Sequence, residues 1–110
     1  MVKNSREISN LINNLISCLK NKGIKVNRLI LFGSYVQGNA RAESDVDVAV
    51  ISETFNNKGL LRRQELLGEA IFRLKEPVEA IGYSYKEFQK RRPLSFLSDI
   101  VANGQVVYKE

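Results

Sequence analysis

The chain has 110 residues, of which 44% are hydrophobic and 26% charged, as is ordinary for a globular protein with one modest core. The absence of histidine excludes a Ser-His-Asp triad and histidine-ligated zinc, and the single cysteine excludes an internal disulfide and a cysteine-cluster metal site. The net charge of +5 is compatible with an anionic partner, although a solvated lysine-rich surface is the commoner explanation.

A first helix is expected over Ser5 to Lys22, where apolar residues recur at helical spacing. Ser5 is the expected N-cap of this helix, and Gly23 is its expected stop. Because Cys18 lies on the apolar stripe, we expect a buried and unreactive thiol. The helix should pack on a sheet, and it carries no visible chemistry.

The next apolar run, Leu29 to Phe32, is short and ends at a glycine, which predicts a buried strand. Gly33 permits a sharp turn and close backbone approach, and Ser34 is a favoured N-cap for a helical turn that ends at Gly38. Free amides at such a helix start are a ready site for phosphate. An ordinary turn without a ligand has the same residues, so this segment alone decides nothing.

A second strand is predicted over Val46 to Ile51, and two aspartates lie at its start. Because successive side chains of a strand point to opposite faces, Asp45 and Asp47 should share one face while Val46 and Val48 enter the core. Two adjacent carboxylates favour either a raised pKa or a bound cation. Their oxygens suit a hard ion such as Mg²⁺, completed by substrate phosphates, whereas a solvated strand edge is the alternative.

Taken together, these segments resemble the polymerase-beta-like nucleotidyltransferase superfamily. The shared signature is Gly33-Ser34, ten intervening residues, and Asp45-Val46-Asp47. The small size of the chain resembles the minimal nucleotidyltransferase branch, in which such proteins are antitoxin partners of HEPN-domain proteins. The resemblance implies that Gly33 and Ser34 bind the triphosphate and that Asp45 and Asp47 bind both metal and nucleotide.

The middle of the chain reads as a polar loop over Ser52 to Lys58 and a helix over Gly59 to Leu74. Arg62 and Arg63 lie on the polar side of this helix, where solvated side chains are a better explanation than contact with a phosphate.

A third strand is expected over Pro77 to Gly82. Within it, Glu79 has apolar neighbours in sequence, so we expect it to be paired, protonated or bound to metal. The resemblance places the third family carboxylate here, where relatives usually have aspartate. Glu76 is the fallback candidate, and a charge facing water is the structural alternative for Glu79.

The last third of the chain predicts a short helix over Tyr85 to Arg92, a second over Leu94 to Ala102 after the break at Pro93, and a final strand over Gln105 to Tyr108. The first of these is basic, with four cationic residues: Lys86, Lys90, Arg91 and Arg92. They fit a helix C-terminus better than a nucleic-acid surface, because no recognised binding motif accompanies them.

These elements predict an α/β (α+β) domain over residues 1–110, with a mixed sheet of about four strands and helices mainly on one face. The apolar runs are too short to span a membrane and no signal-peptide pattern is present, so we expect a cytoplasmic protein.

The expected function is Mg²⁺-dependent transfer of a nucleoside monophosphate from its triphosphate to an acceptor hydroxyl. The expected donor is ATP, which transfers AMP, or another nucleoside triphosphate. In the family two ions act, with Asp45 and Asp47 holding them and Glu79 completing the second site and accepting the proton. The expected acceptor is a HEPN-type partner protein, with a homo-oligomer also possible. The alternatives are a catalytically weak nucleotide-binding module, an aminoglycoside-like small-molecule transferase, and a basic nucleic-acid-binding domain.

Overall fold

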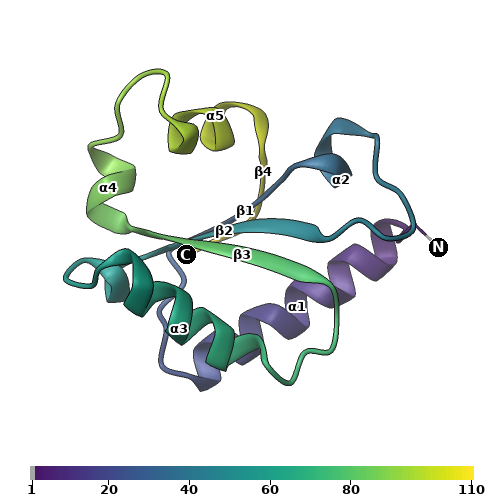
Figure 1. Cartoon of the computed structure of the whole chain (residues 1–110), viewed down its shortest axis with the longest axis horizontal. Coiled ribbons are helices and arrows are strands. Elements are labelled where there is room, and N and C mark those ends of the chain that lie inside the picture. The colour runs from purple at the N-terminus through teal and green to yellow at the C-terminus, as the bar shows by residue number, and fades with distance from the viewer. Residues whose placement is uncertain (1) are drawn as a thin grey trace.

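The computed structural model describes residues 2–110, and these form a four-stranded mixed sheet flanked by helices (Figure 1). The strands are β1 (Arg28–Phe32), β2 (Val46–Ser52), β3 (Val78–Ser84) and β4 (Gln105–Lys109). Their order across the sheet is β3-β2-β1-β4, with β1 antiparallel to β2 and β4, and β2 parallel to β3. The predicted four-stranded mixed sheet is therefore confirmed.

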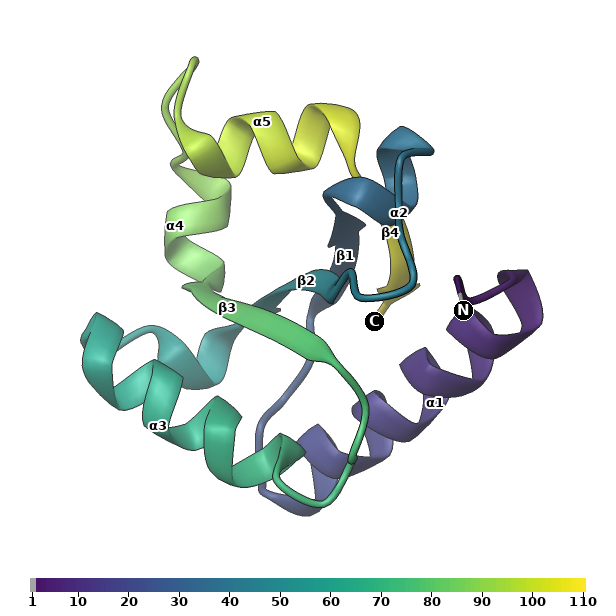
Figure 2. The ribbon, with the colours of Figure 1, turned by 45° about the vertical axis from the view of Figure 1, so that its right-hand side comes forward.

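Helices cover both faces of this sheet, but the two longest share one face (Figure 2). These are α1 (Ser5–Asn21) and α3 (Leu60–Ile71), while α4 (Tyr85–Gln89) and α5 (Phe96–Asn103) lie over the other face. The four-residue α2 (Ser34–Gln37) follows β1, and the 3-10 helix η1 (Glu53–Phe55) follows β2. The expectation of helices mainly on one face holds for the long pair, and α4 and α5 add a partial second layer.

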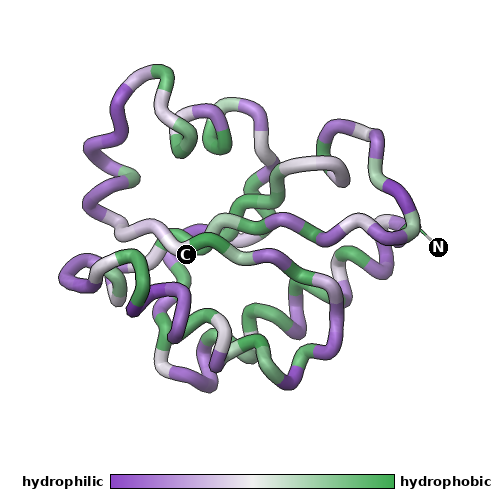
Figure 3. The backbone as a smooth tube through the Cα atoms, in the orientation of Figure 1, coloured by the Kyte–Doolittle hydropathy of each residue, from purple (hydrophilic) through white to green (hydrophobic). Residues whose placement is uncertain are grey.

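Two hydrophobic clusters follow from the alternation of side chains along the strands. In β2, Val46, Val48 and Val50 are fully buried against α1 and α3, whereas Ala49 and Ile51 face α5. Strands β1 and β2 stand out as apolar segments of the backbone (Figure 3). This pattern leaves the odd-numbered positions at the start of β2 on the α5 face, which is the face that carries the polar residues described below.

Several predictions for α1 and α3 differ from the structure in detail. The N-cap of α1 is Asn4 rather than Ser5, because Asn4 and Glu7 form a reciprocal capping box. The thiol of Cys18 is half-buried rather than buried. Helix α3 ends at Ile71, before the expected Leu74.

The segment predicted as a polar loop over residues 52–58 is more ordered than expected. Ser52 is the buried last residue of β2, and its hydroxyl caps η1 by accepting a hydrogen bond from the Thr54 amide at 3.0 Å. The ring of Phe55 is fully buried in the core beneath Gly82. The buried Phe55 ring therefore holds the otherwise polar segment 52–58 against the core.

The C-terminal third departs from prediction in the lengths of its elements. Strand β3 starts at Val78, after Pro77, and α4 ends at Gln89 rather than Arg92. Helix α5 starts at Phe96, because Ser95 caps it by accepting from the Ser98 amide at 3.0 Å. Among the helices of residues 2–110, none has the length and apolar character needed to cross a membrane.

Candidate active site

The carboxylates singled out in the sequence lie on the α5 face of the sheet. Asp47 of β2 and Glu79 of β3 are direct neighbours in the parallel register. Asp47 is half-buried, Glu79 is exposed, and Asp45 is exposed one residue before β2 begins. Glu79 is exposed rather than buried among its sequence neighbours, because the flanking Val78 and Ala80 pack in the core on the opposite face of β3.

The electrostatics of this group centre on Asp47. Burial raises the pKa of its carboxyl above the ordinary value, and the charges of Glu79 and Asp45 raise it further. None of these three carboxylates forms an ion pair with another side chain among residues 2–110. The described part of the chain also contains no ready-made group of three metal-ligating side chains, because two of the carboxylates extend toward solvent.

The Gly33-Ser34 turn lies directly against Asp47. Gly33 has φ +78° and ψ −151°, and a Cβ built on it would lie 2.2 Å from Oδ2 of Asp47. Only glycine tolerates both the backbone conformation and this contact. Gly33 is also the N-cap of α2, so the prediction that Ser34 caps the helix is wrong, and Ser34 is instead its first residue.

Helix α2 is a single turn whose hydrogen bonds start at Gly33. The amides of Val36 and Gln37 both donate to the Gly33 carbonyl at 3.0 Å, and Gly38 ends the turn with φ +83°, as predicted. The amides of Ser34 and Tyr35 have no acceptor within the described residues. These two N–H groups are the donors that a phosphate at this turn would use.

A cavity of about 390 Å³ opens beside Asp47 and Glu79. Its remaining lining is mostly apolar and comes from β1, α3, β3 and α5: Phe32, Leu60, Gln64, Ala80, Ile81 and Phe96. The rings of Phe32 and Phe96 meet edge to face, with centroids 6.0 Å apart. Sequence reasoning did not identify these lining residues, because their apolar spacing reads only as core.

Gln64 holds the outer edge of β3, which is an edge strand of the sheet. Its side-chain amide donates to the Ala80 carbonyl at 3.2 Å, and its oxygen accepts from the Gly82 amide at 3.4 Å. These bonds occupy the backbone groups on either side of Ile81, two residues beyond Glu79. A side chain of α3 thereby fixes the strand that carries Glu79.

The two arginines of α3 have different surroundings. Arg62 lies in solvent and contacts Glu65 and Glu69 at 3.7 and 3.9 Å, as expected for a helix face. Arg63 is only 12% exposed, donates to the Lys58 carbonyl at 2.8 Å, and is paired with Glu87 of α4. Arg63 is therefore a structural link between α3 and α4 rather than a solvated side chain.

The remaining candidates lie outside the carboxylate cavity. The fallback residue Glu76 pairs with Lys3 at 3.3 Å and does not line the cavity. The four basic residues of the 86–92 segment line a separate groove of about 530 Å³ between α4 and α5. Phe96 borders both the groove and the carboxylate cavity, so the two hollows are adjacent.

Comparison with known proteins gives concordant results. The family described as polymerase beta nucleotidyltransferase matches residues 13–110. A protein of Methanocaldococcus jannaschii, named a candidate protein adenylyltransferase, is 26% identical over 98 residues, which is 88% of this chain and 94% of that protein.

Two solved structures share the fold. The crystal structure of a candidate nucleotidyltransferase from Sulfolobus solfataricus superimposes with a TM-score of 0.60 at 16% identity, covering 100% of this chain and 93% of that one. A toxin-antitoxin crystal structure with AMP-PNP also gives a TM-score of 0.60, at 24% identity, and covers 89% of this chain and 73% of that one.

Proposed function

Because the chain belongs to the polymerase beta nucleotidyltransferase family and is a nucleotidyltransferase, we propose that it transfers AMP from ATP to a hydroxyl group of an acceptor protein. The observation that carries this proposal is the contact of the Gly33 turn with Asp47, whose register neighbour is Glu79. A phosphate-binding turn and a carboxylate pair are thus adjacent. The adenylyltransferase name of the archaeal relative and the AMP-PNP in one structural neighbour support AMP as the transferred group.

The residues fit a divalent cation. Burial raises the pKa of Asp47, the negative charges of Glu79 and Asp45 raise it further, and no cationic side chain of residues 2–110 pairs with any of the three carboxylates. Mg²⁺ binds through one or two carboxylates plus substrate phosphates, so a preformed cage of three is not needed. Asp45 and Asp47 would hold the metal, and rotation of the exposed Glu79 side chain would complete a second position.

In the proposed reaction, the acceptor oxygen attacks the α-phosphorus of ATP. The bond from that phosphorus to the bridging oxygen breaks, and pyrophosphate leaves with the electron pair. Glu79 accepts the hydroxyl proton, since among the described residues that line the cavity only Asp47 and Glu79 have side chains that can act as a base, and Asp47 is assigned to the metal. When bound, Mg²⁺ lowers the cost of the negative charge that develops on the attacking and leaving oxygens.

The amides of Ser34 and Tyr35 and the Ser34 hydroxyl would hold the β- and γ-phosphates, because a helix start presents donors and a positive dipole end to an anion. Because Gly33 has no Cβ, the turn lies against Asp47, and bound phosphates would be near the carboxylate that would hold the metal. The largely apolar cavity beside Glu79, bordered by Phe32 and Phe96, would receive the acceptor.

We further propose a folded partner protein as the acceptor, of the HEPN type in a toxin-antitoxin pair. One structural neighbour is a toxin-antitoxin structure, which supports this assignment. The groove between α4 and α5 offers a docking surface, since its lining combines four cationic side chains with apolar groups such as Leu97. Its border with the carboxylate cavity at Phe96 would guide the acceptor hydroxyl toward Glu79.

The test is to incubate the protein with Mg²⁺, ATP and the HEPN-type protein encoded beside it, and to measure intact masses. The proposal predicts a partner that gains the mass of one or more AMP groups, and no gain with the Asp47→Asn variant. A partner that binds but keeps its mass would favour a nucleotide-binding regulator instead. A partner that neither binds nor gains mass would reject the protein acceptor.

A further inference from the structure

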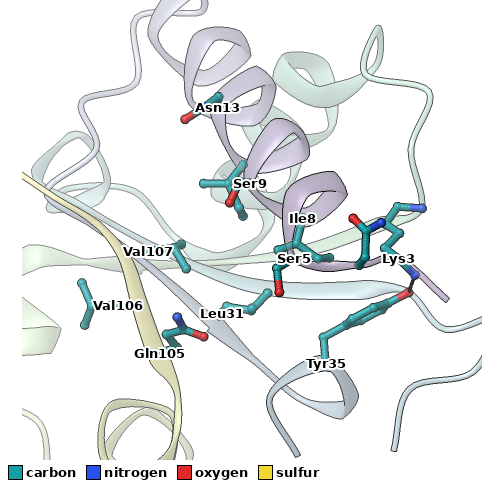
Figure 4. Close-up of a pocket in the computed structure, with 12 residues that line it drawn as sticks. Lys3, Ser5, Ile8, Ser9, Asn13, Leu31, Tyr35, Gln105, Val106 and Val107 are labelled. Carbon is teal, nitrogen blue, oxygen red and sulfur yellow. Dashed lines mark hydrogen bonds between the residues drawn. The ribbon is translucent and has the colours of Figure 1, made fainter. Parts of the chain in front are cut away.

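Lys3 makes two contacts with segments far away in the sequence. Its backbone amide donates to the hydroxyl of Tyr35 at 3.2 Å, and its ammonium group pairs with Glu76 at 3.3 Å. Figure 4 shows the Tyr35 ring extending from α2 toward Lys3, with the hydrogen bond drawn. The Lys3 side chain is 19% exposed and that of Glu76 is 40% exposed, so solvent screens this ion pair mainly from the Glu76 side.

The two contacted segments lead to the two halves of the active site. Tyr35 follows Ser34 in α2, and its amide is one of the two donors assigned to phosphate. Glu76 precedes Pro77, whose carbonyl accepts from the amide of Val46 at 2.7 Å. Val46 lies between Asp45 and Asp47, so the second contact leads to the carboxylates.

Lys3 is itself held firmly. It precedes Asn4, which forms the reciprocal capping box with Glu7 at the start of the 17-residue α1. Helix α2, in contrast, has four residues and no side-chain cap at Gly33. A short turn that must aim two amides at a phosphate depends on outside contacts for its orientation, and Tyr35 provides one.

We infer that Lys3, Tyr35 and Glu76 form a clamp that sets the position of the phosphate-binding turn relative to the carboxylates. Lys3 and Glu76 are positioning residues, since they touch neither the proposed nucleotide nor the metal. The clamp rests on the proposed function in one respect, namely that α2 binds the triphosphate. Loosening it should therefore weaken the binding of β- and γ-phosphates without changing the contacts of AMP.

The experiment compares the affinities of ATP with Mg²⁺ and of AMP, by calorimetry, for the wild-type chain, Tyr35→Phe, Lys3→Met and Glu76→Gln. Tyr108→Phe is the matched tyrosine control, because Tyr108 packs in the core from β4 and contacts Lys20 instead. Glu69→Gln is the matched ion-pair control, since Glu69 pairs with Lys22 at 3.6 Å on the surface.

The clamp predicts that its three variants lower the affinity for ATP about fivefold or more, with AMP affinity and the controls within twofold of wild type. A purely structural role would move ATP and AMP affinities equally, and that result would overturn the inference. Wild-type affinities for ATP in all three variants would overturn the clamp and leave the proposed function standing. Failure of the wild-type chain to bind ATP would overturn it together with the proposed function.

Discussion

Gly33 and Asp47 are so close that a Cβ on the glycine would lie 2.2 Å from the carboxylate oxygen Oδ2. No side chain fits between the turn and the carboxylate, so the proposed phosphate site and metal site share a boundary. Catalysis of group transfer depends on such positioning, because reactants that are already held in place do not lose further translational and rotational entropy when they react.

Gly33→Ala should therefore abolish most nucleotide transfer, with a loss of about 10²-fold or more, since it displaces either Asp47 or the turn. Gly38→Ala is the matched control. Gly38 also has a positive φ, of +83°, but nothing lies within 4 Å of a Cβ there. Gly38→Ala should lose roughly 1–2 kcal/mol of stability from its left-handed backbone. Gly33→Ala should lose more, because its backbone conformation is nearly confined to glycine and the added Cβ would clash with Asp47. Equal activities of the two variants, assayed at a temperature where both are folded, would contradict this role of Gly33.

Asp47→Asn should raise the free energy of unfolding at neutral pH when EDTA is present. The folded state raises the pKa of Asp47, so it holds a proton more tightly than the unfolded chain does. Ionisation of Asp47 therefore costs stability as the pH rises from below about 4 through the folded-state pKa. Denaturant titrations at pH 7 and at pH 3.5 should show a gain at pH 7 that shrinks at pH 3.5. A less stable variant at pH 7 would mean that Asp47 has a favourable partner.

Glu87→Gln should show the opposite pH dependence. Burial alone would raise the pKa of Glu87, but hydrogen bonds from Ser84 and the charge of Arg63 lower it below the ordinary value. Its stabilising contribution is then present above the unfolded-state pKa and is lost as the pH falls through the folded-state pKa. The variant should be less stable than wild type at pH 7 and nearly equal to it once the pH lies below the folded-state pKa of Glu87. A constant difference at all pH values would assign the effect to packing.

Glu79→Gln should leave most nucleotide binding intact and lower transfer by about 10²-fold or more, the usual range for a lost general base. Glu65→Gln is a suitable control, because Glu65 lies on the solvent side of α3 beside Arg62. Transfer at the wild-type rate by the Glu79 variant would return this residue to the role of a solvated strand charge.

The strands and the approach of Asp45 and Asp47 to one face could be predicted from sequence, because alternation in a strand fixes which side chains share a face. The third carboxylate followed from a resemblance, and the exposure of Glu79 at the edge of a largely apolar cavity was not predicted. Neighbours along a strand point away from one another, so Val78 and Ala80 say nothing about the environment of Glu79.

Other parts of the site depend on contacts between distant segments, which no local pattern reveals. The cavity wall at Phe32 and Phe96 joins residues that are far apart in the sequence. The pairing of Arg63 with Glu87 and the support of β3 by Gln64 need the packing of α3 along the sheet edge. The contacts of Lys3 with Tyr35 and Glu76 also join distant segments, so local sequence patterns do not predict them.

The proposed metal site can be tested most directly by a calorimetric titration of ATP into the wild-type chain and into Asp45→Asn and Asp47→Asn, each with Mg²⁺ and with EDTA. We expect the wild-type chain to bind ATP only when Mg²⁺ is present, and both variants to lose that binding, because the carboxylates would hold the ion that joins ATP to the protein. Equal affinity for ATP in Mg²⁺ and in EDTA would contradict a metal-dependent nucleotide site at Asp45 and Asp47.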